Sequence, residues 1–317
     1  MNLYVDHDFP IAGNSKRPHE LVPFPKFFGI QCSPYIQDWK LHFERRKELK
    51  SHHAGFFLVA VSSLTKDLTS FHNVVPEQSF EQNNYTGKFY FNFFKSDGQQ
   101  IRVVIDDRLP INSEGSLYYA QSVESAFWYP LLEKAYAKFR GSYEFIEYGL
   151  PMESFFHLTK RKPEFFDNGS TTPLPSTSSG MYSKLQKLIS DKCLVTCKLH
   201  DPQGNNQQYG SAFVIVDVME KRRISNDGLV EPRNFVKLRH PSGRIKEDLA
   251  NAMGISDVGI SGEGLMDVEK FLNQMQCVYT VDTSMHTLGL TSGLDAFLPF
   301  IPVKQSSPAN RHRCRKM

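Results

Sequence analysis

The chain has 317 residues, of which 40% are hydrophobic and 22% are charged. A chain of this length can bury a sizeable core in one two-lobed domain or in two domains, so we expect a globular protein. Its formal charge of +3, from 37 basic and 34 acidic residues, is too small to indicate nucleic acid or a membrane surface as a general partner.

The cysteines and the hydropathy pattern indicate an intracellular protein. The five cysteines are odd in number and irregularly spaced, which argues against a disulfide framework and against a zinc motif; they are Cys32, Cys193, Cys197, Cys277 and Cys314. The N-terminus lacks the pattern of a secretion signal, and no run of 18 apolar residues exists. We therefore expect a protein of the reducing cytoplasm without a transmembrane segment.

The first half of the chain combines helical and strand patterns. A run of small and apolar residues extends from Gly55 to Leu64. Alternating phenylalanines between residues 88 and 95, an Asp-Gly turn and an apolar strand at 101–110 predict a β-hairpin. Residues 126–141 place apolar side chains on one helical face and end in a glycine, which predicts a helix with a glycine C-cap.

A segment rich in Ser, Thr and Pro, residues 167–180, divides the chain. The second half is mostly strand-like, with predicted strands at 193–199, 211–218, 234–239 and 277–283 and predicted helices at 181–189 and 266–275. We expect an N-terminal extension at 1–20, a first lobe at 21–167, a linker at 168–180, a second lobe at 181–300 and a basic tail at 301–317.

Several segments, in this order, resemble the protease core of the calpains, the calcium-dependent intracellular cysteine proteases. They are "LYVDHDFP", "FFLVAVSSLT", "VVPEQSF", "NYTGKFYFNFF", "VVIDDRLP", "FWYPLLEKAYAKFRGSYE", "KLRHPSG" and "GEGLMDVEKFL". The resemblance covers most of residues 3–285 and implies an α+β, papain-like fold of two lobes. In that fold a helical first lobe carries the nucleophile, a β-rich second lobe carries the base, and the active site lies in the cleft between them.

The resemblance implies that the catalytic groups are substituted. The family's nucleophilic cysteine stands at a helix N-terminus, and the matching position here is Gly55, which has no side chain to attack a carbonyl. The base position matches Ser211, the orienting asparagine matches His240, and the oxyanion-hole glutamine falls at Leu49. We therefore expect a non-catalytic calpain-like protein, a pseudoprotease, with a regulatory or protein-binding role.

The resemblance also implies weak or absent calcium binding. Calpain cores hold two calcium ions through carbonyls and carboxylates. The matching carboxylates that remain are Glu153 and Glu263, while Ser261 replaces an aspartate and the loop at 42–53 is largely basic. We expect no cofactor, with calcium bound only if the residual sites still function. Calpain relatives, their inhibitors or their substrates are the partners that the resemblance implies.

Other interpretations remain open at this stage. An active cysteine endopeptidase would need a substitute nucleophile, such as Cys32 or Cys193, brought into hydrogen-bond range of a base. A metal held by His52, His53 and His240 lacks a spaced motif. A degenerate fragment without a selected activity is a further alternative.

The adjacent acids Asp106 and Asp107 look like a catalytic carboxylate pair. Neighbouring residues on a strand point to opposite faces, so the two carboxylates cannot easily share one substrate atom. We expect them to form a turn or ion pairs instead.

Overall fold

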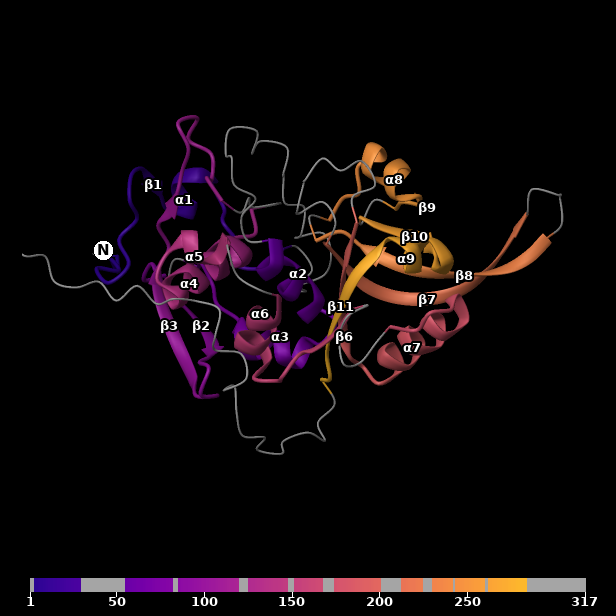
Figure 1. Cartoon of the computed structure of the whole chain (residues 1–317). Coiled ribbons are helices and arrows are strands. Elements are labelled where there is room, and N and C mark those ends of the chain that lie inside the picture. Colours follow the sequence, from indigo (N-terminus) through magenta and orange to yellow (C-terminus); the bar gives the residue numbers. More distant parts are fainter. Residues whose placement is uncertain are drawn as a thin grey trace, which may run out of the picture. The chain divides into compact units, whose positions relative to one another are not determined.

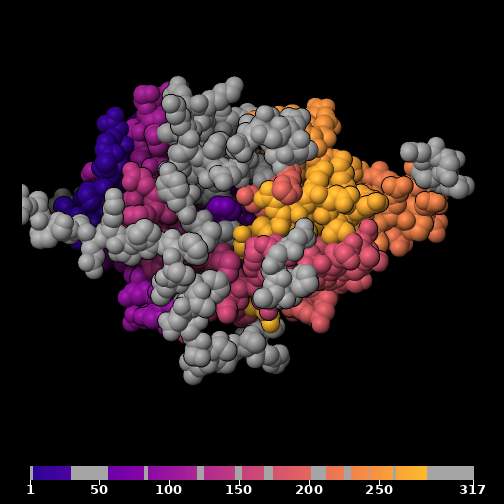
Figure 2. Space-filling view, viewed as in Figure 1, coloured from indigo at the N-terminus to yellow at the C-terminus, as the bar shows by residue number. Residues whose placement is uncertain are grey.

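The computed structural model describes residues 3–29, 55–81, 85–119, 125–147, 151–167, 174–200, 212–224, 230–241, 243–259 and 262–283. These residues belong to one compact unit that contains two large clusters of buried apolar side chains. We call residues 3–159 the first lobe and residues 164–283 the second lobe. Figure 2 shows them as two blocks of colour, indigo to magenta and rose to yellow.

The first lobe is mainly helical. Its elements are β1 (Ser15–Lys16), α1 (Pro18–Leu21), α2 (Gly55–Leu64), α3 (Leu68–Val74), β2 (Lys88–Phe94), β3 (Gln100–Asp106), β4 (Leu109–Pro110), α4 (Trp128–Arg140), α5 (Tyr143–Glu147) and α6 (Pro151–Thr159). The predicted hairpin is confirmed as β2 and β3, which pair in antiparallel register. The predicted helix is confirmed as α4, and Gly141 ends it in the left-handed conformation that glycine adopts without strain.

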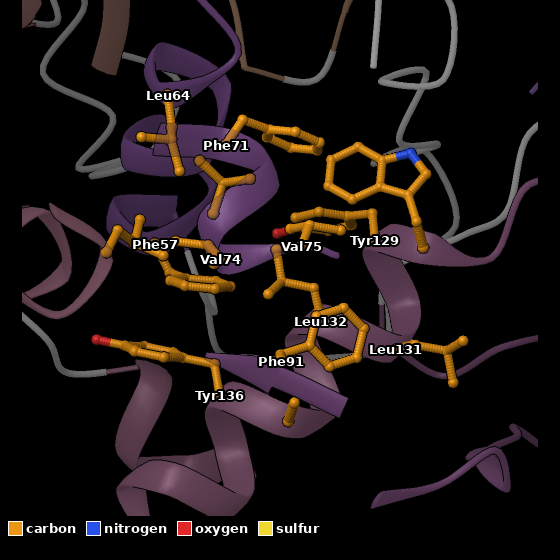
Figure 3. Close-up of a cluster of buried hydrophobic side chains, with 14 of the residues drawn as sticks. Phe57, Leu64, Phe71, Val74, Val75, Phe91, Tyr129, Leu131, Leu132 and Tyr136 are labelled. Carbon is orange, nitrogen blue, oxygen red and sulfur yellow. The ribbon is translucent and has the colours of Figure 1, made fainter. Parts of the chain in front are cut away.

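Aromatic side chains fill the core of the first lobe (Figure 3). The rings of Phe57 on α2 and Tyr136 on α4 stack with their centroids 3.9 Å apart. Trp128 meets Phe71 of α3 edge to face, at 5.2 Å between centroids. Since such pairs favour particular ring orientations, they fix how α2, α3 and α4 pack together.

Buried ion pairs tie α4 and the N-terminal segment to the end of β3. The ammonium of Lys134 donates to the carboxylate of Asp106 and to the carbonyl oxygen of Arg108, the latter at 2.7 Å. Asp107 pairs with Arg17 and accepts a hydrogen bond from Tyr85. Burial alone would raise the pKa of Asp106, but the charge and hydrogen bond of Lys134 lower it overall. The expectation that these adjacent acids form ion pairs is confirmed.

The second lobe is built on an antiparallel sheet of seven strands, in the order β5-β11-β6-β7-β8-β10-β9. Its elements are β5 (Glu164–Asp167), α7 (Ser178–Ser190), β6 (Leu194–Leu199), β7 (Ala212–Ile224), β8 (Val230–Arg239), α8 (Glu247–Met253), β9 (Ile255–Ser256), β10 (Glu263–Asp267), α9 (Val268–Gln274) and β11 (Met275–Val281). The strands and helices predicted from the sequence are present, and the α+β class is confirmed.

Two segments near the expected linker join the second lobe. Residues 164–167, which the sequence boundaries assign to the first lobe, form β5 and pair with β11. Residues 178–180, which those boundaries assign to the linker, form the first turn of α7, and the Thr177 hydroxyl caps the helix by accepting from the Gly180 N–H. A hydroxyl at the N-cap is a local signal for the start of a helix. The Ser and Thr residues at the end of the expected linker therefore mark the beginning of α7.

We predict that Lys134→Met lowers the free energy of unfolding by about 3–5 kcal/mol, because it leaves the carboxylate of Asp106 buried without its cation. Urea unfolding followed by circular dichroism measures this change. The matched variant Lys221→Met removes an exposed partner of Asp257 and should cost less than about 1 kcal/mol. Equal losses in the two variants would show that the buried pair does not stabilise the lobe.

Candidate functional site

Helix α2 begins at Gly55, so the helix that the resemblance implies at this point is present. Both lobes hold it in place. Phe57 stacks on Tyr136 in the first lobe, while Val59 packs against Ala212 and Val214 of β7 in the second. Figure 1 shows α2 lying between the helices of the first lobe and the strands of the sheet. The position of its first residue is therefore fixed from two sides.

The start of β7 and the end of β8 lie beside each other, close to this helix. Val214 of β7 pairs with Arg239, the last residue of β8, and Val59 contacts β7 only one helical turn beyond Gly55. His240 directly follows β8, whereas Ser211, directly before β7, lies outside the described residues. The start of β7 therefore contacts α2 and also pairs with the end of β8, which His240 follows.

The imidazole of His240 is buried, with 8% of the residue exposed. Its ring meets Phe213 edge to face at 5.4 Å between centroids, and its backbone N–H donates to the carbonyl oxygen of Gly262 at 2.9 Å. Burial lowers the pKa of His240 to about 4, because the charged form would lose its hydration. At neutral pH this side chain is a neutral group packed into the protein, and it is a weak base.

The two carboxylates singled out for calcium are engaged by the chain's own cations. Glu153 on α6 forms an ion pair with Arg140 at 3.1 Å. Glu263 on β10 accepts from Arg239 Nε at 2.9 Å and from Lys237 at 2.6 Å. Burial alone would raise the pKa of Glu263, but the hydrogen bonds from Lys237 and Arg239 lower it overall. Among the described residues, no group of three or more His, Cys, Asp or Glu side chains could hold a metal ion.

The described cysteines are poor candidates for a nucleophile. Cys193, Cys197 and Cys277 are free, buried thiols of the second lobe. Burial raises the pKa of all three, and that of Cys197 well above its ordinary value. Because the thiolate is the reactive form, these cysteines are inert near neutral pH. The other predicted site residues lie outside the described residues: Cys32, Leu49, His52, His53, Ser211, Ser261 and Cys314.

A groove of about 690 Å³ on the first lobe was not predicted from the sequence. It lies between the β2–β3 hairpin, α4 and the N-terminal segment, which are far apart in the chain, so no local pattern indicates it. His157 lies at its wall, where burial lowers the pKa to about 3 and Nδ1 is 2.8 Å from the hydroxyl of Tyr136. Its cations Lys138 and Arg140 are paired with Asp6 and Glu153. The other charged residues of its lining are Lys95 and Arg102 against Asp8 and Asp97, so the groove offers little net charge to a ligand.

None of the described helices is long and apolar enough to cross a membrane.

Comparison with known proteins identifies similar chains. A family model described as calpain family cysteine protease matches residues 13–248. Calpain-8 of Mus musculus is 31% identical over 242 residues, which are 73% of this chain and 31% of that protein. Calpain-A of Drosophila melanogaster is 30% identical over 239 residues, 73% of this chain and 27% of that protein. The chain thus spans under a third of the length of these relatives.

We predict that the imidazole of His240 stays neutral until the pH falls towards about 4. An unfolded histidine titrates near pH 6.5, so the unfolded state binds more protons below that pH. The stability that a neutral His240 provides is therefore complete above about pH 6.5 and is lost as the pH falls towards 4. Nuclear magnetic resonance of the ring measures the pKa, and His240→Gln should flatten the pH dependence of unfolding. A ring that titrates at pH 6–7 would contradict its burial.

Proposed function

Because the chain belongs to the calpain family of cysteine proteases, we propose that it is a non-catalytic member, a pseudoprotease that binds other proteins. The family match covers residues 13–248, which include the start of α2, the start of β7 and the end of β8. The catalytic positions Gly55, Ser211 and His240 are assigned by matching the sequence at these three places to the family's motifs. In a papain-like fold they are the places from which nucleophile, base and orienting group face one another.

The observation that carries the proposal is the glycine at the first residue of α2. The unsatisfied N–H groups of a helix N-terminus favour a negative charge, which is why a cysteine there readily becomes a thiolate. Gly55 occupies this electrostatically favourable place without any side chain, so no covalent acyl intermediate can form on it. The described cysteines do not replace it, since all three are buried and protonated.

The remaining catalytic positions support the same proposal. Ser211 matches the base, and a serine hydroxyl does not accept a proton near neutral pH. His240 matches the orienting asparagine; its pKa of about 4 makes it a poor proton acceptor. Loss of all three groups removes nucleophilic attack, proton transfer and orientation together, so a single compensating change would not restore turnover.

Calcium dependence is also lost in this proposal. Glu153 and Glu263 are paired with Arg140, Arg239 and Lys237, and a calcium ion would have to displace these cations. A calcium ion needs six to eight oxygen ligands, and each of the two matched sites keeps one carboxylate of the family pattern. We propose that neither site binds the ion at cytoplasmic concentrations, and the location in the cytoplasm itself stays a prediction.

A binding role follows from what the chain retains. The segments 103–110 and 131–139 keep the buried residues of a folded calpain core, and Leu131, Leu132 and Ala135 are fully buried. A scaffold of this kind presents the surfaces of a protease without its chemistry. The partners that we propose are those an active calpain meets: a related calpain, an inhibitor or a protein substrate. Affinity capture with each of these purified proteins tests the role, and no binding above that of an unrelated chain would count against it.

The alternative function is a calcium-dependent cysteine endopeptidase. The relatives include the Calpain-1 catalytic subunit of Rattus norvegicus, 30% identical over 242 residues, and this likeness keeps the alternative in view. It would require a thiol other than those of Cys193, Cys197 and Cys277 to lie near the start of β7, where the position of the family's base is matched.

We predict no hydrolysis of a disordered protein substrate by the purified chain at any calcium concentration, because nucleophile and base are both absent. Release of soluble peptides, measured beside an authentic calpain, tests this. Turnover that requires calcium and stops on thiol alkylation would establish the alternative.

We also predict that Gly55→Cys introduces a thiol that iodoacetamide alkylates at least about tenfold faster at pH 7 than the thiol of Asp97→Cys, because a helix N-terminus lowers a thiol pKa. The control position lies on the exposed turn of the β2–β3 hairpin, away from any helix end. Gly55→Cys should still show no peptide release, since Ser211 cannot act as base. Equal alkylation rates would mean that residue 55 does not present a side chain at an effective helix N-terminus.

A further inference from the structure

The hairpin of β7 and β8 projects beyond the rest of the sheet, as the orange strands in Figure 1 show. β6 pairs with β7 only as far as Val214, and β10 pairs with β8 only at residues 235–239. In the described part of the chain, residues 220–224 and 230–234 pair only with each other, and we call them the arm. An unpaired strand edge of this kind is a template for pairing with another chain.

The two edges of the arm differ. On β8, Pro232 lies directly opposite Arg222 of β7. A proline has no N–H to donate, so it fits where its backbone faces away from the partner strand. In an antiparallel ladder, opposite residues either exchange both hydrogen bonds or both face away from each other. Pro232 therefore interrupts the outer edge of β8, while the N–H and the carbonyl group of Arg222 face the open edge of β7.

The open edge of β7 extends over several residues. Backbone direction alternates along a strand, so every second residue from Val218 to Ile224 faces the same edge as Arg222. The N–H of Val218 supports this direction, because it donates to the carboxylate of Asp217 at 2.8 Å. Asp217 is exposed, so a further strand can replace this local bond. The edge can therefore accept one more strand in antiparallel pairing.

The side chains along this edge carry opposite charges. Glu220 and Arg222 are exposed, and no ion pair of the described residues includes either of them. Lys221 and Arg223 point to the other face of the strand, where both bind Asp257, at 3.1 and 2.7 Å. The open edge thus presents one acid and one base, two residues apart, without a partner in the described part of the chain.

We propose that this edge pairs with the same edge of a second copy of the chain, in antiparallel register about Lys221. Glu220 of each copy then lies opposite Arg222 of the other, so a favourable charge pair forms twice. Ile224, which is 75% exposed, lies opposite the apolar Val218 of the other copy. All of these residues face the open edge, so each opposite pair exchanges both backbone hydrogen bonds.

Charge selects this register among its neighbours. A two-fold axis at Glu220 or at Arg222 would bring two like charges directly opposite each other, which is unfavourable. With the axis at Lys221 the two lysines lie opposite each other, but each is bound to Asp257 of its own copy, which reduces their repulsion. The contact uses one short strand from each copy, and small interfaces are generally weak. We therefore expect a dimer that dissociates on dilution.

Sedimentation equilibrium of the full chain over a dilution series measures this association. Glu220→Arg places an arginine opposite Arg222 of the other copy at both symmetric positions, so the dissociation constant should rise at least about tenfold. Adding Arg222→Glu restores opposite charges in exchanged order and should return the association to that of the unaltered chain. The control Glu231→Arg makes the same change in net charge at an exposed position of β8 and should leave the association unchanged.

Three results would overturn the proposal. They are a chain that is monomeric at every concentration, a double variant that associates as weakly as Glu220→Arg, and an equal loss of association in Glu231→Arg.

Oxidative cross-linking tests the register. Lys221→Cys brings the two introduced thiols directly opposite each other, with Cβ atoms about 5 Å apart, close to the separation that a disulfide needs. Arg223→Cys is the matched control, because it also loses an ion pair to Asp257 but lies opposite Met219 of the other copy. Its two thiols are about 14 Å apart in this register, too far for a disulfide.

We expect at least about tenfold more disulfide-linked dimer from Lys221→Cys than from Arg223→Cys, measured by intact mass and corrected for the unaltered chain. Equal yields from the two variants would overturn the register about Lys221.

Discussion

The packing of α2 between two cores is the constraint on which the candidate site depends. Phe57 is stacked on Tyr136 on one side, and Val59 is set against Ala212 and Val214 on the other. Because successive faces of one short helix are buried in different lobes, neither its axis nor its first residue can shift without opening a packed contact. The same contact sets the start of β7, and through the pairing of Val214 with Arg239 it also sets the place of His240.

The fold of the chain and its catalytic groups have to be considered separately. The chain keeps the helix and strand positions from which a papain-like protease acts, and we propose that it has lost the groups that act. The acids considered for catalysis or calcium binding have structural partners: Asp106 pairs with Lys134 and Asp107 with Arg17, and Glu263 is shared by Arg239 and Lys237. Buried carboxylates that are already paired hold the fold together and have little capacity left for a metal ion or a substrate proton.

Local patterns predicted the elements well. The alternating phenylalanines gave the β2–β3 hairpin, and the apolar face ending in Gly141 gave α4, because both signals act over a few residues. The start of α2 came from resemblance, since a run of small apolar residues does not define its own first turn.

The long-range contacts left no signal in the sequence. Arg17 and Asp107 lie 90 residues apart, and Lys66 and Val216 lie 150 apart. No periodicity links such positions, and the same holds for the pairing of β5 with β11. The burial of His240 also depends on Phe213 of a neighbouring strand. The low pKa that results from this burial could therefore not be predicted from the sequence.

The most direct test of the central claim is covalent labelling of the purified chain with a peptidyl electrophile that traps an active-site thiolate, read by intact mass with and without calcium. A chain without a catalytic nucleophile should gain no adduct under conditions in which an authentic calpain is fully labelled. A stoichiometric, calcium-dependent adduct on one cysteine would contradict the pseudoprotease account and would identify the substitute nucleophile.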